Sequence, residues 1–551
     1  MRVNEATKLT WISNPLGATP RIPYPPRMRE PGLRFSPRHA KTLPLACAYL
    51  LAATAVAPAD DAPQWGHAWT RNQVSSEKGL PTSFDPASGR NLRWTAPLGT
   101  EAHSTPVVAG GRVYIGTNNN RPRDPRHRGD RGVLLCLDEK DGRLLWQLVV
   151  PKRSEDPYFD WPNSGISSPA TVEGDLVYIV SNRGEVLCLD ARGLANGNQG
   201  PYTDEGRHMS PADDPPLEPG PLDADIIWLF ELTSGAGIWS HDAAHSSILV
   251  RGEHLYLNTG TGVDNTHRKI RAPDAPSLVV LDKSTGRLLA REREGIAPNI
   301  FHSTWAPPSL GRLGERELVL LAAGNGVVYA FEPISKTPPA GEVLALEKVW
   351  SYDFDPAAPK ENVHAYNQNR KEGPSNIYGA PVIHDDRVYV AGGGDYWWGK
   401  VEARIQCIDG TGRGDITRSG RVWSTELGRH VFSTPAIHEG LVYIADTRKR
   451  IHCLEARDGS TVWTHDVGGE FWASPHVADG KIFIGTRRGE VLVLSAGREK
   501  KVLGKSDVED PISATVTTAN GVAYVASMTR LYAVAESPGK ASGVEAPPAS
   551  R

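Results

Sequence analysis

One pattern of apolar and polar positions recurs along the chain. A short apolar run is followed by a polar turn with Gly or Asp, and then by a run in which apolar and polar residues alternate. The copies cover residues 107–116, 171–180, 249–258, 310–322, 382–391, 436–445, 476–485 and 517–526. Such alternation around a polar turn, with Val, Ile and Tyr on both sides, is typical of a β-hairpin. Gly440, Gly480 and Gly521 recur at intervals of about 40 residues, which is the period of a four-stranded propeller blade.

Two further strands are expected after each hairpin. The third is apolar, as in GEVLCLD at residues 184–190, and the fourth carries Trp or Leu, as at Trp146 and Trp463. The last copy lacks its fourth strand, and residues 91–94, which end in Trp94, have the missing pattern. We therefore predict an all-β fold over residues 91–536. It is an eight-bladed β-propeller of four-stranded antiparallel blades, closed by pairing of an N-terminal strand with the last blade, which removes two exposed sheet edges.

Composition agrees with this fold and excludes one class of partner. Of 551 residues, 55 are Gly and 44 are Pro, which exceeds the usual ~7% and ~5% and favours many turns over long helices. With 61 Lys and Arg against 64 Asp and Glu, the chain has no basic field for a nucleic-acid backbone. We therefore expect no nucleic acid among its partners.

Cysteines occupy one position of the repeat. Four of the five stand in third strands, where a small buried side chain packs: Cys136, Cys188, Cys407 and Cys453. Equivalent positions on different blades are expected to exceed the roughly 7 Å between Cα atoms that a disulfide allows. The sequence therefore predicts free thiols and no metal site at these cysteines.

The N-terminal region carries the one long apolar run, residues 42–59, preceded by basic residues and ending in small ones. That layout is typical of a secretory signal peptide cleaved near residues 57–59. We expect residues 1–59 to be a non-globular extension with this signal, 60–90 a lead-in segment, and 537–551 a disordered tail. The mature chain would be periplasmic or extracellular and monomeric, without a transmembrane segment. A membrane anchor, lipid attachment at Cys47, and a start at Met28 instead of Met1 are the alternatives.

The third and fourth strands resemble a known repeat. The strings LDEKDGRLLW at residues 137–146 and LDKSTG at 281–286 are similar to the repeat of pyrroloquinoline quinone (PQQ)-like eight-bladed propellers. The resemblance covers about residues 91–536, and the long loops resemble BamB-like secreted repeat proteins of planctomycete type. It implies either a PQQ-dependent quinoprotein oxidoreductase of alcohol dehydrogenase type, with quinone and calcium, or a cofactor-free protein such as a BamB-like outer-membrane protein assembly factor. Such dehydrogenases typically cover the quinone with a disulfide between adjacent cysteines. No two cysteines are adjacent here, so no cofactor is predicted.

Long connections indicate the functional face. Second-to-third-strand and blade-to-blade connections lie on one face of a propeller, and here they are extended over blades one to five, at residues 118–132, 259–276, 392–403, 150–167, 233–245 and 351–379. Loops longer than about 12 residues in a compact domain are usually functional or disordered. Basic residues at 121–131 suggest a solvated loop of this face, and the insertion at 191–225 is expected on the opposite face.

Aromatic and histidine residues gather in these connections. Our candidate ligand-binding residues are Trp161, Trp239, His241, His245, His302, Trp305, Tyr378, Tyr396, Trp397 and Trp398. Rings with a polar edge suit a small molecule, a saccharide or a protein partner. An alternative role, packing the inner ends of neighbouring blades, applies to Trp305, Phe432, Phe471 and Trp472.

No catalytic residue or metal ligand is predicted. His241, Asp242 and His245 are ligand types for transition metals. Two histidines four residues apart share a face only in a helix, however, and this segment leads into a strand. Hydrogen-bonded histidines at a channel mouth, with His103 and His302, are the favoured interpretation. Because no catalytic triad order, phosphate loop or dinucleotide fingerprint stands out, our first hypothesis is an exported non-catalytic scaffold. The question of enzymatic activity stays open.

Overall fold

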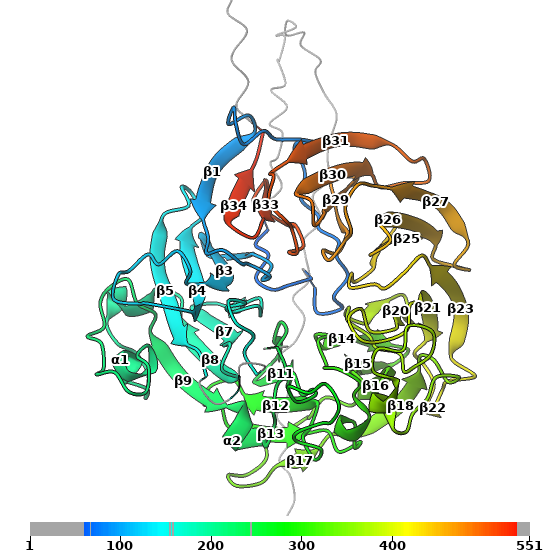
Figure 1. The fold of residues 1–551 in the computed structure, drawn as a ribbon, viewed down its shortest axis with the longest axis horizontal. Helices are drawn as coiled ribbons and strands as arrows, with labels where there is room; N and C mark the ends of the chain where they lie inside the picture. The colour runs from blue at the N-terminus through cyan, green and yellow to red at the C-terminus, as the bar shows by residue number, and fades with distance from the viewer. Residues whose placement is uncertain (1–59, 67, 154–155, 157–158, 243–244, 537–551) are drawn as a thin grey trace, which may run out of the picture. The chain divides into compact units, whose positions relative to one another are not determined.

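The computed structural model describes residues 60–66, 68–153, 156, 159–242 and 245–536. Eight sheets follow one another around a ring, with the first strand of each toward the centre and the fourth at the outside (Figure 1). The prediction of an all-β, eight-bladed propeller is confirmed. The predicted signal peptide, Cys47 and the predicted tail lie outside the described residues. No helix within the described ranges is both long and apolar enough to cross a membrane.

Blades 1 to 4 follow the chain in order. Blade 1 comprises β2 (Val107–Ala109), β3 (Arg112–Asn118), β4 (Arg131–Asp138) and β5 (Leu144–Pro151). Blade 2 comprises β6 (Thr171–Glu173), β7 (Leu176–Val180), β8 (Glu185–Asp190) and β9 (Ile226–Glu231). Blade 3 comprises β10 (Leu249–Arg251), β11 (His254–Asn258), β12 (Leu278–Asp282) and β13 (Leu288–Arg291), with β17 (Leu344–Ala345) added in parallel. Blade 4 comprises β14 (Ser309–Leu313), β15 (Arg316–Ala322), β16 (Val327–Phe331) and β18 (Lys348–Asp353), with β22 (Gly414–Asp415) added in parallel.

Blades 5 to 8 complete the ring. Blade 5 comprises β19 (Val382–His384), β20 (Arg387–Gly393), β21 (Ala403–Asp409) and β23 (Arg421–Leu427). Blade 6 comprises β24 (Ala436–His438), β25 (Leu441–Asp446), β26 (Arg450–Glu455) and β27 (Thr461–Asp466). Blade 7 comprises β28 (His476–Ala478), β29 (Lys481–Gly485), β30 (Glu490–Ser495) and β31 (Val502–Asp507). Blade 8 comprises β32 (Thr517–Ala519), β33 (Val522–Ala526), β34 (Arg530–Val534) and β1 (Leu92–Pro97). Short helices lie in the connections: η1 (Gly193–Asn196), α1 (Glu205–His208), α2 (Leu232–Ala236), η2 (Ala297–Asn299) and η3 (Val363–Tyr366).

The first strand of the chain closes the ring, as predicted. β1 pairs with β34 in antiparallel register, with Trp94 opposite Ala533 and Thr95 opposite Tyr532. The outermost strand of blade 8 therefore comes from the opposite end of the sequence. Closure leaves no gap between blades 8 and 1 at which a core edge would be exposed.

Tryptophans of the outer strands connect neighbouring blades. The Trp94 indole donates a hydrogen bond to the Glu139 carbonyl in the β4–β5 turn of blade 1, at 2.9 Å. Gly142 of the same turn has a φ of 74°, and a Cβ there would lie 2.6 Å from the Trp94 ring. The same bond recurs from Trp146, Trp228, Trp423 and Trp463 to the next blade. The outer-strand Trp of one blade and the turn Gly of the next therefore form a single contact, which we call the joint between blades.

The lead-in segment, residues 60–66 and 68–90, contacts the inner strands of successive blades. Its backbone carbonyls accept hydrogen bonds from blade 1 at Ala62, blade 4 at Trp69 and blade 5 at Thr70. Farther along, Glu77 accepts the Gly521 amide of blade 8 at 2.8 Å. Because these contacts include the first hairpin turns, the segment lies on the face opposite the long connections.

Arg71 anchors this segment. Its side chain is fully buried, and its guanidinium donates to the carbonyls of Pro308 at 2.9 Å, Trp65 at 2.7 Å and Ser247 at 3.2 Å. A fourth bond reaches the Ser247 hydroxyl at 3.3 Å. One cation thereby ties the lead-in segment to the connections that enter blades 3 and 4.

The insertion at 191–225 corrects one expectation. It does not stay on the opposite face, because Asp223 bridges Gln147 on the outer strand of blade 1. Arg126, in the connection of the elaborated face, pairs with Asp223 at 3.1 Å, and His127 beside it is buried. Arg126 and His127 therefore contact the insertion, whereas most of the basic stretch around them is exposed, as expected of a solvated loop.

Candidate functional site

A cavity of about 590 Å³ opens at the centre of the face that carries the long connections. Every blade-to-blade connection contributes to its wall. The lining residues are Glu101, His103, Trp161, Ser164, Ser167, Asp242, His245, His267, His302, Trp305, Tyr378, Trp397, Trp398, Phe432, Trp472 and Ser513. Its volume falls in the range of small-molecule sites. Convergence from the whole ring places the cavity at the mouth of the central channel.

Most of the residues proposed from the sequence meet in this wall. Those that line the cavity are Trp161, His245, His302, Trp305, Tyr378, Trp397 and Trp398. The other three are not lining residues. Trp239 stacks under the Arg271 guanidinium at 3.5 Å, Tyr396 contacts Trp397 at 5.3 Å between ring centroids, and His241 contacts His302 at 4.9 Å.

Aromatic rings form a continuous part of the wall. Trp305 and Tyr378 lie 5.0 Å apart, and Phe432 lies 5.0 Å from Trp472, between ring centroids. Trp161 is 44% exposed and Trp397 is 43% exposed, although both are large apolar side chains. Phe471, which shared the packing alternative with Trp305, Phe432 and Trp472, is instead fully buried in the core.

Asp395 organises this wall from behind. Its Oδ1 accepts the backbone N–H groups of Trp397 at 3.1 Å and Trp398 at 2.8 Å. Its Oδ2 accepts the Tyr378 hydroxyl at 2.6 Å and pairs with His302 Nδ1 at 2.9 Å. Burial opposes ionisation of Asp395, but the contacts with His302 and Tyr378 outweigh it and lower the pKa to about 2. One buried carboxylate therefore fixes two rings and the tryptophan loop.

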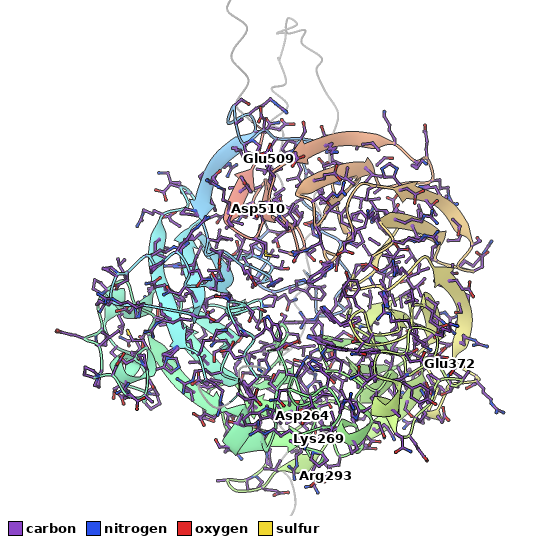
Figure 2. All side chains as sticks on the ribbon, in the orientation of Figure 1. Asp264, Lys269, Arg293, Glu372, Glu509 and Asp510 are labelled. Atoms are coloured by element: carbon purple, nitrogen blue, oxygen red, sulfur yellow. The ribbon has the colours of Figure 1, made fainter. Side chains whose placement is uncertain are left out.

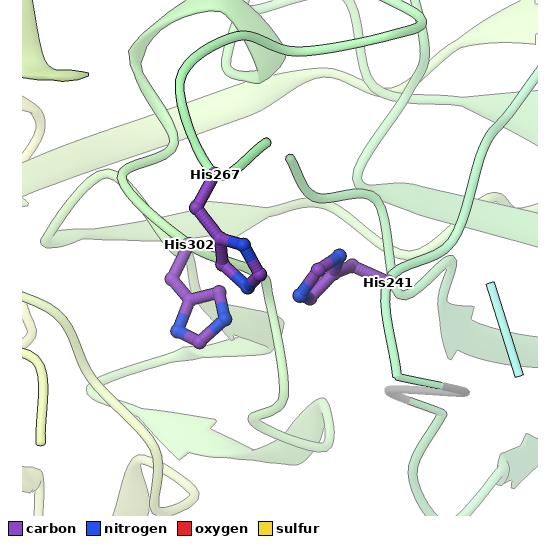
Figure 3. A group of neighbouring side chains, drawn as sticks. All are labelled: His241, His267 and His302. Atoms are coloured by element: carbon purple, nitrogen blue, oxygen red, sulfur yellow. The ribbon is translucent and has the colours of Figure 1, made fainter. Parts of the chain in front are cut away.

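Three histidines from separate connections meet beside the cavity (Figure 3). His241 precedes blade 3, His267 lies between β11 and β12, and His302 precedes blade 4. One nitrogen from each ring lies within 4.8 Å of the others. Burial, followed by the neighbouring histidines, lowers the pKa of His241 and of His267, so both imidazoles are neutral near pH 7.

Contacts within its own loop hold His267 in place. The Asp264 amide donates to the Lys269 carbonyl at 2.9 Å, and Lys269 Nζ lies 3.8 Å from Asp264 Oδ2. Both residues are labelled in Figure 2. His267 has a φ of 55°, and its ring packs on Trp398 at 4.7 Å. This tight turn directs the imidazole toward His241 and His302.

In the structure His241 clusters with His267 and His302, and not with His245, its neighbour in the chain. His245 lines the cavity but does not belong to the group of three histidines. Asp242 lies beside the group, with its Oδ2 3.5 Å from His241 Nε2. Burial raises the pKa of Asp242 to about 6.

The donor set does not fit a quinone with calcium. PQQ is a polycarboxylate, whereas the side chains lining the cavity include Glu101 and Asp242 and, among the described residues, neither Lys nor Arg. Calcium prefers oxygen ligands, and the clustered donors here are imidazole nitrogens. The cavity is therefore chemically unlike a site for that cofactor.

His267 and Asp395 are functional-site residues that sequence reasoning missed. Neither lies in a strand of the repeat, and each acts through residues from other connections. The available signal was weak: His267 lies in a long connection that was expected to be functional, and Asp395 directly precedes the Tyr396-Trp397-Trp398 run.

Comparisons with known proteins agree with the fold. Residues 53–193 and 404–502 match a family model described as outer membrane protein assembly factor BamB. No curated protein sequence matches the chain. A europium-containing methanol dehydrogenase is 11% identical with a TM-score of 0.53, covering 86% of this chain and 98% of that one. BamB from Moraxella catarrhalis is 14% identical with a TM-score of 0.47, covering 80% and 96%. At these identities the likeness to the methanol dehydrogenase shows the fold alone.

Proposed function

Because this chain is a PQQ-like β-propeller with an aromatic cavity at the mouth of its ring, we propose that it is an exported scaffold that binds a short neutral oligosaccharide in that cavity. The observation that carries the proposal is the pair of exposed tryptophans, Trp161 and Trp397, within a concave site. Exposing large rings to water is unfavourable, and a ligand that covers them recovers this cost.

The chemistry of the wall selects the ligand class. A sugar has an apolar face that packs on an aromatic ring and hydroxyl groups that need polar partners. Here the same wall also carries the polar side chains of Glu101, His103, Ser164 and Ser513. Two carboxylates, without Lys or Arg among the described lining residues, disfavour an anionic ligand.

One part of the proposal, export, rests on sequence. Export rests on the apolar run at residues 42–59. A quinone-dependent activity is not proposed because the donor set does not fit that cofactor. The name of the matched family suggests assembly of outer-membrane proteins, but no described surface favours such a partner over a sugar.

The test is calorimetric titration of the mature chain with cellotriose, xylotriose and maltotriose. We expect one of these to bind at one site, with tryptophan fluorescence changing in parallel. Trp397→Ala should weaken binding at least 10-fold while the thermal transition changes little, since the ring is 43% exposed.

Leu222→Ala is the matched control, because Leu222 is an exposed apolar residue, 53% accessible, outside the cavity. It should leave binding unchanged. No binding of any of the three sugars, or an equal loss in both variants, would refute the proposed function.

A further inference from the structure

We propose that His241, His267 and His302 bind one divalent transition-metal ion of the zinc class, with a further coordination position open to the cavity. The three imidazoles come from separate connections, and one nitrogen of each lies within 4.8 Å of the others (Figure 3). The site stands on these histidines alone and does not depend on the sugar ligand.

The hydrogen bonds on the outer sides of the rings direct the inner nitrogens. His302 Nδ1 lies 2.9 Å from the Asp395 carboxylate, and His241 and His267 each bond to a backbone group, at Val263 and Asn265. A ring that donates its N–H outward presents a bare lone pair on its other nitrogen. Metal-binding histidines are oriented in this way by carboxylates and carbonyls.

Two of the inner nitrogens, those of His241 and His302, lack a hydrogen-bond partner among the described residues. Both are Nε2 atoms, and both are buried. Buried polar atoms nearly always have a hydrogen-bond or metal partner, so we expect one for each of these two nitrogens. A cation held between the three rings supplies that partner to both atoms at once.

Charge and distance suit a dication. The buried carboxylate of Asp395 lies directly behind His302, and Asp242 lies 3.5 Å from His241 Nε2. Zinc–nitrogen bonds of about 2.0–2.1 Å hold tetrahedral ligand nitrogens roughly 3.4 Å apart, so small rotations of the side chains close the site. Imidazole donors favour zinc, copper or nickel over calcium or magnesium.

The cavity supplies the open position. His267 and His302 both line it, so an ion held by the three rings faces the cavity on its remaining side. Three protein ligands with one exchangeable position are the arrangement of catalytic and ligand-binding zinc sites, whereas structural sites are closed by four. A hydroxyl group of a bound molecule could therefore reach the ion directly.

A second cluster of similar composition lacks this property. Asp124, His127 and Asp223 also lie close together. The Arg126 guanidinium pairs with both carboxylates, at 2.6 Å and 3.1 Å, and already supplies the positive charge. The three-histidine cluster has no such internal cation among the described residues around it.

The experiment uses the mature chain stripped with EDTA and titrated with zinc sulfate by calorimetry, and with cobalt(II) by visible absorption. We expect one ion per chain with a Kd below about 1 µM, and the cobalt bands typical of a four-coordinate site with three imidazole nitrogens and one exchangeable ligand. His241→Ala and His267→Gln should each weaken zinc binding at least 100-fold. His245→Ala is the matched control and should bind zinc normally, because His245 lines the same cavity outside the cluster.

Asp395→Asn tests the positioning residue and should weaken zinc binding by about 10- to 100-fold. His267 is partly exposed, so His267→Gln keeps the assignment testable even if a buried variant fails to fold. Absence of stoichiometric zinc binding, or zinc binding that survives both His241→Ala and His267→Gln, overturns the proposal. Sugar titrations of the same EDTA-treated protein separate this outcome from failure of the proposed function.

Discussion

Replacing Arg71 by Met removes the anchor of the lead-in segment while keeping a long side chain. The buried carbonyl oxygens of Pro308 and Ser247, the part-buried carbonyl of Trp65 and the Ser247 hydroxyl lose their donor. Each bond to a charged group is worth about 1.5–3 kcal/mol, and relief from burying a cation offsets part of the total. We expect a net loss of about 3–5 kcal/mol in the free energy of unfolding.

Thermal unfolding followed by near-ultraviolet circular dichroism measures this loss, with an expected fall in the midpoint on the order of 5 °C or more. Limited trypsin digestion locates it, because the exposed Lys78 lies in the same segment and should be cleaved faster once the segment loosens. Arg457→Met is the matched control, since the Arg457 side chain is 87% exposed. A midpoint within about 1 °C of the parent, together with unchanged cleavage at Lys78, would refute the reasoning.

Further expectations concern the joints between blades, the thiols and acid stability. Gly142→Ala should lower the thermal midpoint more than Gly110→Ala. Both positions have positive φ, but only at Gly142 would a Cβ meet the Trp94 ring, at 2.6 Å; equal shifts would argue against the joint. In the native protein at pH 8 the four described thiols should not react with Ellman's reagent, because burial raises their pKa to about 11 to 12, and unfolding should release all four: Cys136, Cys188, Cys407 and Cys453. Burial opposes ionisation of Glu185, but contacts with His208 and Arg183 lower its pKa from 4.5 to about 2. Its stabilisation is therefore complete above pH 4.5 and declines as the pH falls toward 2. Glu185→Gln should flatten the fall in denaturation midpoint over that range, and an unchanged slope would contradict this role.

The sequence predicts the ring because its signals are local and repeated. Alternation within each hairpin, the paired Trp and turn Gly, and the spare strand at Trp94 can all be recognised within one repeat length. The structure adds that Trp94 and Gly142 belong to neighbouring blades and touch.

The site could be predicted only in part, because it is made of residues brought together by closure. His241, His267 and His302 lie in connections of different length, and no periodicity relates them. The sequence offered only His245 as a nearby companion of His241, and that pair was not predicted to bind a metal because the segment is not helical. Separation along the chain does not predict which residues meet, because every blade-to-blade connection reaches the same central cavity.

Docking of β1 and of the lead-in segment has a consequence for biosynthesis. Both segments are made before blade 1, yet the partner of β1 is β34, and Glu77 of the lead-in segment accepts a hydrogen bond from the Gly521 amide in the first hairpin of the last blade. During translation β1 therefore stays unpaired until β34 has been made, and its exposed edge can pair with another chain in the meantime. A polypeptide truncated before blade 8 would keep that strand without its mate and would be prone to exchange it with a second copy.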